Sequence, residues 1–391
     1  MKRSVIAAVA AGLGLAAIGG GVAAHLYLRP DPYTYFDSSI KHQGRLEYDA
    51  AILDATKAIE IDPHNSLLVS HRGQIYADMG KDDLALADLN AAVAMDARSA
   101  DPLDDRADFY ERRGKTGLAL ADYEKAAQLD PHSARTFDRR GSLHAQLGHF
   151  DQALADIDHA VALAGNVTDR AIYLNDRSEA SSAKGDQDAA IAGAMKAIAA
   201  ASKQDTLNVS WAHMRIAVAK RRKGDLAGAM DEASQGVQLA GFNVRARLEL
   251  GLERFATGDM KGAAEQLREI TSDAYYKKGA ASALLFGYLA NARSGEPADL
   301  QLADDAGNVR GDAWSTSLVD MYLGKETPEA TLAAAAGPNE TCEAHLHIGE
   351  WHLLKGKSAN AAEAFKKAVA TCARTKIEYT IADAELKRIK L

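Results

Sequence analysis

The chain has little of what marks an enzyme or a nucleic-acid-binding protein. It contains no P-loop, no Gly-x-Ser-x-Gly elbow, no His-Glu-x-x-His pair and no dinucleotide-binding glycine pattern. Aromatic residues make up only 6% of the 391 residues, and the formal net charge is −8, without a basic stripe that carries interleaved aromatic residues. These absences predict a non-enzymatic protein with no cofactor and no nucleic-acid partner.

Strand-like patterns are missing as well. No stretch of useful length alternates apolar and polar residues, so the sequence favours an all-α chain. Glycine recurs regularly instead: Gly80, Gly114 and Gly148 lie 34 residues apart, with Gly44 slightly out of step. We number each 34-residue block so that the regular glycine is position 15. Small residues then fall at positions 8, 20 and 27, and larger ones at 4, 11, 17 and 24.

These positions are explained by a pair of antiparallel helices. Small residues such as Ala107 and Ala119 let two helix backbones approach closely, while the larger residues fill the gaps. Glycine permits the left-handed conformation that ends the first helix, and a proline such as Pro131 ends the second. The pattern resembles the tetratricopeptide repeat (TPR). The resemblance implies an all-α TPR solenoid of antiparallel helix hairpins that forms a right-handed superhelix and ends in a C-terminal capping helix.

The regularity of the pattern divides the chain. We predict four regular TPR repeats over residues 29–165, divergent TPR-like helical repeats over 166–340, and a final repeat with its capping helix over 341–391. In the divergent part the glycine spacing rises to 37 and 39 residues, which we interpret as longer loops between repeats. Alanine nevertheless keeps position 20 there, at Ala190, Ala229 and Ala263.

Residues 1–28 differ from the rest of the chain. Lys2 and Arg3 precede an apolar run rich in alanine and glycine, which is uncharged unless His25 is protonated. The run fits a cleavable signal peptide, or a single-pass anchor that leaves the repeats on the periplasmic face of the inner membrane. Both interpretations predict export, the first to the soluble periplasm. A lipoprotein anchor is excluded because no cysteine lies near the junction.

A second resemblance lies near the C-terminus. The features that carry it are Trp314, the Tyr322-Leu323-Gly324 turn, Gly349-Glu350-Trp351 and Glu378-Tyr379. The stretch resembles the C-terminal part of the NlpI lipoprotein family of bacterial envelopes. That resemblance implies an envelope protein that docks other proteins, in that family cell-wall hydrolases and a protease. Because this chain lacks the lipid-bearing cysteine and carries more repeats, the identity of the partner does not transfer.

The first helix of each TPR repeat lines the concave face, chiefly with positions 2, 5, 6, 9 and 12. The third repeat places acidic residues there, the fifth places acidic and amide residues, and the sixth places arginines, so the surface is predicted to change sign along its length. The predicted partner-binding residues are Asp101, Asp104, Asp105, Asp108, Glu111, Asn175, Asp176, Glu179, Arg215 and Arg221. We expect the acidic stretch to hold a basic segment of a partner.

Other interpretations of these residues stay open. The chaperone-binding subclass of TPR proteins is excluded, because Ser70 and Gln74 stand where it needs lysine and asparagine. The charged positions also fit an ordinary solvated helix face. A small-ligand receptor, or an enzyme with its site in residues 166–340, is the alternative to a scaffold that binds envelope proteins.

Arginine and aspartate recur in the regular repeats. Position 7 is arginine in four consecutive repeats and position 23 is aspartate in four, but the two sets are offset by one repeat. Pairing inside each repeat leaves one residue of each kind over, whereas pairing across neighbouring repeats leaves none. We therefore predict four inter-repeat ion pairs, Asp54–Arg72, Asp88–Arg106, Asp122–Arg140 and Asp156–Arg177.

Cys342 and Cys372 are the only cysteines, and they lie at the two ends of the final repeat. Their midpoint falls on the Gly356-Lys357 turn, so an antiparallel hairpin brings them within reach of a disulfide bond. Because export leads to an oxidising compartment, we predict that they form one.

The histidines of the final repeat lie close to Cys342 in the sequence. Helical spacing lets no more than three potential ligands converge, so we predict packing positions and no metal site. The residues considered are His345, His347, Glu350 and His352.

Overall fold

A computed structural model describes residues 31–271, 280–296, 298, 302–306 and 313–389. Within these ranges the chain is all-α, without a strand. It consists of two compact units, and the division falls between Leu143 and His144. The predicted signal peptide or anchor lies outside the described residues. No helix in the described ranges has the length and apolar character needed to cross a bilayer.

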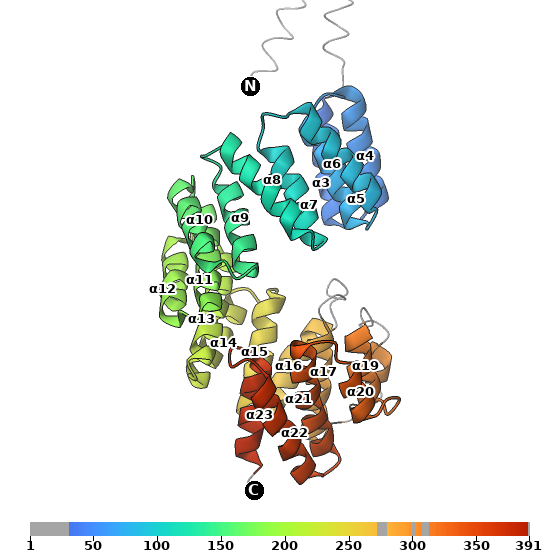
Figure 1. The fold of residues 1–391 in the computed structure, drawn as a ribbon, viewed down its shortest axis with the longest axis vertical. Helices are drawn as coiled ribbons and strands as arrows, with labels where there is room; N and C mark the ends of the chain where they lie inside the picture. The colour runs from blue at the N-terminus through green and yellow to red at the C-terminus, as the bar shows by residue number, and fades with distance from the viewer. Residues whose placement is uncertain (1–30, 272–279, 297, 299–301, 307–312, 390–391) are drawn as a thin grey trace, which may run out of the picture. The chain divides into compact units, whose positions relative to one another are not determined.

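Unit 1 consists of helix hairpins that follow one another along the chain. In each hairpin a first helix packs on a second: α3 on α4, α5 on α6 and α7 on α8 (Figure 1). The helices are α3 (Pro32–Gly44), α4 (Tyr48–Ile61), α5 (Ser66–Asp78), α6 (Asp82–Met95), α7 (Asp101–Arg112), α8 (Thr116–Leu129) and α9 (Ala134–Gln146), the last of which contains the division between the units.

The turns between paired helices explain the regular glycine. Gly80 and Gly114 have φ angles of 72° and 69°, the left-handed region in which a Cβ atom is costly. In the first repeat the same position is Leu46, whose φ is 60°. Gly44 is therefore not the turn residue of its repeat, which accounts for its irregular spacing.

The small residues lie where the helices of a hairpin approach closely. Ala107, Ala119 and Ala126 of the third repeat are all fully buried. In the second repeat position 8 is Gly73, where a Cβ atom would lie 3.0 Å from Leu89 Cγ. The helix backbones therefore approach closely at these positions, and larger buried residues such as Tyr123 and Leu89 fill the remaining space.

Two of the predicted inter-repeat ion pairs, Asp54–Arg72 and Asp88–Arg106, are wrong. Arg72 forms a bidentate pair with Asp88 of its own repeat, at 2.7 and 2.9 Å, and Arg106 does the same with Asp122, at 2.8 Å for both bonds. The contact to the preceding repeat goes to position 25 instead, where Arg106 Nη1 donates to Asn90 at 2.8 Å.

The two residues that seemed to be left over have other partners. Asp54 accepts from Ser38, the residue at position 7 of the first repeat, at 2.7 Å. Arg177 pairs at 2.6 Å with Asp158, again at position 25 of the preceding repeat. The sequence does contain four arginines at position 7 and four aspartates at position 23, as counted. The predicted pairing ignored that serine can donate to an aspartate and that the residue at position 25 can accept from an arginine.

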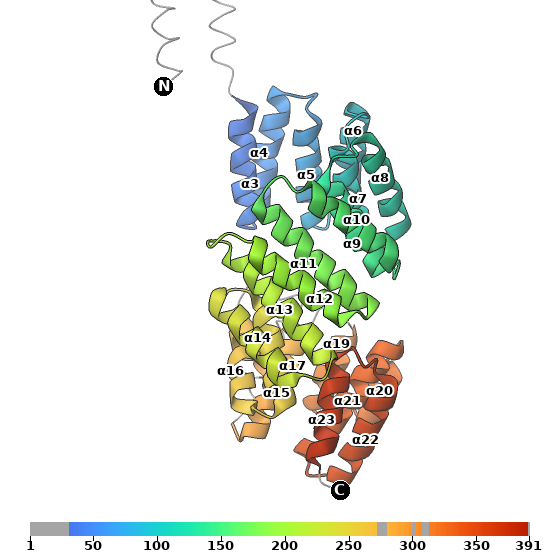
Figure 2. The same cartoon turned by 90° about the vertical axis from the view of Figure 1, so that its left-hand side faces the viewer.

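Unit 2 continues the hairpins and packs them in chain order from α11 to α15 (Figure 2). Its helices begin with α10 (Phe150–Leu163), α11 (Val167–Lys184), α12 (Gln187–Ala200), α13 (Thr206–Arg222), α14 (Leu226–Leu239), α15 (Val244–Thr257) and α16 (Met260–Thr271). They end with α17 (Ala280–Ser294), α19 (Ala313–Tyr322), α20 (Pro328–Ala334), α21 (Pro338–Leu354), α22 (Ser358–Thr371) and α23 (Ile377–Arg388).

The wider glycine spacing of the divergent repeats lies in helices and not in loops. α11 has 18 residues and α13 has 17, whereas α7 of the regular third repeat has 12. The prediction of longer inter-repeat loops is therefore wrong. Ala190 and Ala229 remain fully buried, so the longer helices keep the close approach at position 20.

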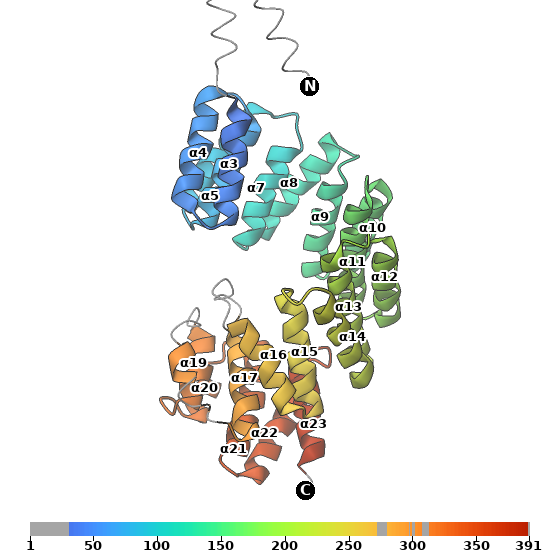
Figure 3. The ribbon, with the colours of Figure 1, turned by 180° about the vertical axis from the view of Figure 1, so that it is seen from behind.

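The C-terminal helix α23 packs on more than the last repeat. It contacts α21 and α22 and also α15, beside which it lies in Figure 3. Arg388 donates to the carbonyl oxygen of Ala256, 132 residues earlier in the chain. Arg293 of α17 pairs with Glu350 of α21 at 3.1 Å and with Glu385 of α23 at 2.7 Å. The predicted capping helix thus joins the end of unit 2 to its middle.

The final repeat holds both cysteines side by side. Cys342 and Cys372 are joined by a disulfide bond, with 4.8 Å between their Cα atoms. Of the histidines nearby, His347 is buried and lies 3.0 Å from the hydroxyl of Tyr322. In the described parts of the chain, no group of three or more His, Cys, Asp and Glu side chains is placed to hold a metal ion.

Candidate functional site

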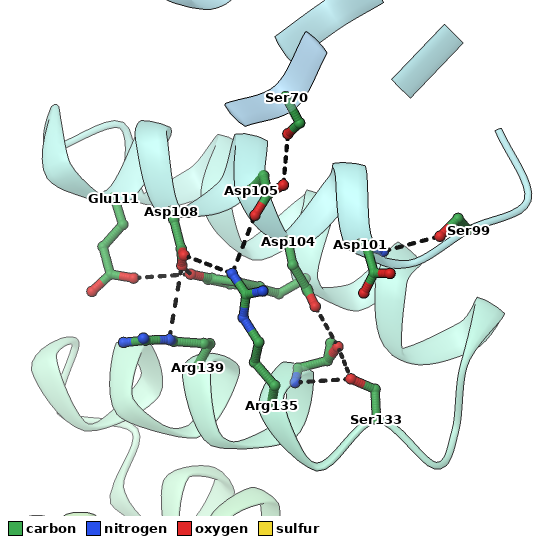
Figure 4. Close-up of polar contacts among 12 residues, drawn as sticks. Ser70, Ser99, Asp101, Asp104, Asp105, Asp108, Glu111, Ser133, Arg135 and Arg139 are labelled. Carbon is green, nitrogen blue, oxygen red and sulfur yellow. Dashed lines mark hydrogen bonds and ion pairs between the residues drawn. The ribbon is translucent and has the colours of Figure 1, made fainter. Parts of the chain in front are cut away.

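Figure 4 shows that acidic side chains of helix α7 bond to residues of neighbouring helices. Asp104 is only 1% exposed and accepts from the Thr136 hydroxyl at 2.7 Å, and Asp105 accepts from the Ser70 hydroxyl at 2.6 Å. Burial raises the pKa of Asp104 to about 6. These carboxylates connect α7 to α9 and to α5.

The remaining acids of α7 are covered in part by arginines. Asp108 lies 3.3 Å from the guanidinium of Arg135, accepts from the Tyr123 hydroxyl and has Arg139 at 4.0 Å (Figure 4). Glu111 also accepts from Tyr123, at 3.2 Å.

Asp101 is exposed, whereas Asp108 and Glu111 are half-buried. The prediction that these acids face a basic segment is wrong for the buried Asp104 and Asp105, whose oxygens are used inside the repeat stack. For the other three acids it stays a prediction.

The candidates in the divergent repeats separate into interior and surface residues. Asn175 is 5% exposed and donates to the carbonyl oxygen of Asn208 at 3.0 Å, so it fixes α11 against α13. Asp176 is half-buried. Glu179 is exposed, and its carboxylate pairs with Arg215 of α13.

Around that pair, α11, α13 and α15 form a pocket of about 190 Å³ that we call the arginine pocket. Four arginines and two glutamates supply its charged side chains, and Met214 and Val218 are among its apolar ones. The charged residues are Arg215, Arg221, Arg222, Arg245, Glu179 and Glu249.

The four guanidinium groups differ in what they bind. Arg221 is held at the base of the pocket by Glu253, at 2.6 Å, and by Glu249, at 3.2 Å. Glu253 is fully buried, and burial raises its pKa to about 7.

Arg222 donates to two acceptors on Ser182, the carbonyl oxygen at 2.8 Å and the hydroxyl at 2.7 Å, and to the carbonyl oxygen of Thr375 at 3.3 Å. Burial, followed by repulsion from Arg221, lowers the pKa of Arg222 below its ordinary value. This guanidinium therefore lies in an environment already rich in positive charge.

Arg245 is exposed and has no ion-pair or hydrogen-bond partner among the described residues. It occupies position 2 of its repeat, counted from Gly258 at position 15, and Glu249 occupies position 6. Neither Arg245 nor Glu249 was among the predicted partner-binding residues, which came from concave-face positions of the third, fifth and sixth repeats. The same concave-face positions, counted in the seventh repeat, would have predicted both residues.

The paired helices, the 34-residue spacing and the buried small residues define the protein as a TPR solenoid. No family model matches the chain, and no curated protein does. Solved structures do resemble it. A TPR protein from Parabacteroides merdae has a TM-score of 0.48 and 19% identity, over 61% of this chain and 91% of that one.

Two other similar structures are bacterial. PilF from Pseudomonas aeruginosa has a TM-score of 0.43 and 16% identity, over 55% of this chain and 95% of that one. A thermophilic TPR protein from Thermus thermophilus has a TM-score of 0.40 and 23% identity, over 46% and 97%. At these identities the likeness concerns the fold alone. The resemblance of the C-terminal stretch to the NlpI family stays a prediction.

Proposed function

We propose that this protein is a non-enzymatic scaffold of the bacterial cell envelope that binds partner proteins through the first helices of its TPR repeats. The observation that carries the proposal is the arginine pocket, in which the exposed Arg245 has no partner in the described chain. A free guanidinium is a fork of donors suited to a carboxylate of another protein. The pocket is also smaller than the roughly 300–1,000 Å³ usual for small-molecule sites, which favours a partner's side chain over a free ligand.

The envelope location is supported by two features. The segment 1–28 has the pattern of a signal peptide or anchor. The disulfide bond between Cys342 and Cys372 belongs to an oxidising compartment, where such bonds persist.

Partner binding is tested by affinity purification from crosslinked cells. The full chain is compared with its Arg245→Glu and Lys196→Glu variants. Lys196→Glu is the control, because Lys196 is exposed, carries the same charge and lies on α12, the second helix of its hairpin. We expect one set of proteins to be recovered with the full chain and with Lys196→Glu, and lost with Arg245→Glu. Identical sets from all three would contradict a scaffold that acts through this face.

Location is tested by alkylating thiols in intact cells before lysis. Mass spectrometry of the unreduced protein is expected to find neither Cys342 nor Cys372 alkylated. Two alkylated cysteines, together with recovery in the cytoplasmic fraction, would refute the envelope location and leave the scaffold proposal standing.

A further inference from the structure

The arginine pocket contains more positive charge than its own carboxylates balance. Arg222 bonds only to carbonyl and hydroxyl oxygens, and Arg245 bonds to nothing in the described chain. Neither has a carboxylate within ion-pair distance there, although both belong to the lining of one pocket. Two guanidinium groups of the pocket therefore lack a carboxylate partner, and of these Arg245 is the exposed one.

The pocket already contains two carboxylates of the chain itself. Glu179 and Glu249 already place carboxylates against Arg215 and Arg221, the second at 3.2 Å. The Glu179 side chain is 51% exposed, so its ion pair with Arg215 is open to solvent and to a competing carboxylate. The Nε of Arg215 is buried without a hydrogen-bond partner, which leaves this guanidinium incompletely satisfied.

The position of the pocket indicates a peptide as the carrier of that anion. Its residues come from three consecutive first helices, α11, α13 and α15, so an extended chain lying across them meets guanidinium groups in succession. A volume of about 190 Å³ admits side chains but leaves little room for a nucleotide or a lipid headgroup with its chains.

We infer that the arginine pocket binds an acidic peptide segment of a partner protein, with carboxylates held by Arg245 and Arg222 and by Arg215 once Glu179 has moved away. This inference rests on the proposed scaffold function and names the chemistry of its partner. Charge-assisted bonds of this kind are among the stronger ones available to a side chain.

The test uses fluorescence anisotropy with the full chain. The probe is a fluorescein-labelled peptide with two adjacent glutamates between Gly-Ser flanks, and the matched probe carries glutamines instead. We expect the glutamine peptide to bind at least about tenfold more weakly. Binding of the glutamate peptide should weaken as salt rises, because the charges lie at a solvated surface.

Three variants separate the pocket from general charge. Arg245→Gln is expected to weaken the glutamate peptide about tenfold, and Glu179→Gln to tighten it by removing the internal competitor. Lys196→Gln, with the same change of charge on the exposed side of α12, should leave affinity unchanged. Melting curves of each variant check that the fold is intact.

The inference is overturned if the two peptides bind equally, if neither binds at millimolar concentration, or if Lys196→Gln weakens binding as much as Arg245→Gln. Displacement by inorganic phosphate at lower concentration than by unlabelled glutamate peptide would also overturn it, since the pocket would then select phosphate. If the glutamate peptide does not bind but Arg245→Glu still abolishes partner capture, the inference of an acidic peptide segment is refuted. The proposed scaffold function would then still stand.

Discussion

At the scale of single residues, Leu46 has a backbone conformation that is unfavourable for leucine. It has a φ of 60°, the region that glycine fills at the same position in later repeats, and its side chain is 51% exposed. Relief of the backbone strain outweighs the extra freedom that glycine gives the unfolded chain. We expect Leu46→Gly to raise the unfolding free energy of unit 1 by about 1 kcal/mol.

Urea unfolding measures that change. The reverse substitution at a turn where glycine has a φ of 69°, Gly114→Leu, serves as the control and should destabilise. A loss of stability in Leu46→Gly would mean that the leucine contributes packing that the exposed fraction of its side chain does not suggest.

Asp104 gives the pH-dependent prediction. Burial raises its pKa to about 6 from an ordinary 3.8, so the folded chain binds a proton more readily than the unfolded chain between these values. Its ionisation above about pH 6 therefore opposes folding. We expect Asp104→Asn to be more stable than the natural chain at pH 7.5, by about 2 kcal/mol.

The advantage of Asp104→Asn should shrink as the pH falls from 6 towards 4, because the natural aspartate is then protonated. Melting temperatures at pH 7.5 and pH 5 measure it. Asp101→Asn, on the exposed side of the same helix, should change little at either pH. A constant difference across the pH range would show that the charge of Asp104 is not what matters.

Residue types predicted the fold better than they predicted the partners of the charged side chains. Alanine at positions 8, 20 and 27 has one physical role, close approach, so its burial followed from the spacing. A carboxylate has several partners within reach. Asp105 bonds to Ser70 of the preceding repeat and to Arg135 of the next. The 34-residue period does not indicate which of the possible partners Asp105 takes. The site was predictable as a set of positions, and not as a set of contacts.

At the scale of helices, the period fixed where hairpins turn but not how long each helix runs. Gly185 ends α11 at a left-handed turn, as expected. The helix itself begins at Val167 after Asn166, whose side chain caps it. The spacing between two glycines gives the combined length of loop and helix, so it cannot tell how many residues belong to each. The asparagine cap, in contrast, marks the residue at which the helix begins.

The final hairpin carries the prediction for this scale. The disulfide bond closes a loop with a sequence separation of 30 residues, so its loss frees the unfolded chain. We expect reduction, or Cys372→Ser, to destabilise the α21–α22 hairpin by about 3–4 kcal/mol. Hydrogen exchange should rise in α21 and α22 and stay unchanged in α11 and α12. Equal exchange before and after reduction would mean that core packing alone holds the hairpin.

At the scale of the whole molecule, unit 2 depends on contacts between distant parts of the sequence. One core cluster includes residues of α15 to α17 and of α21 to α23, which extends well past a single repeat. A sequence period describes neighbours only, so the contact of α23 with α15 could not be read from it. In an open solenoid each repeat would touch only the next.

Arg293 holds this arrangement together. It is the cation between two fully buried carboxylates, Glu350 and Glu385, on two other helices. Burial raises the pKa of Glu350, and the guanidinium of Arg293 opposes that rise. We expect Arg293→Met to destabilise unit 2 by about 3 kcal/mol, since two buried carboxylates lose their shared partner while Arg388 still neutralises one of them.

The loss should appear as faster proteolysis of α23 and as a lower urea midpoint for unit 2, while the transition of unit 1 stays where it was. Adding Glu350→Gln to Arg293→Met should recover part of the stability, because it removes an unpaired buried charge. A simple hydrophobic contact of the Arg293 stem would give no such recovery. If the single and double variants unfold at the same midpoint, the three-helix ion pair does not join the end of unit 2 to its middle.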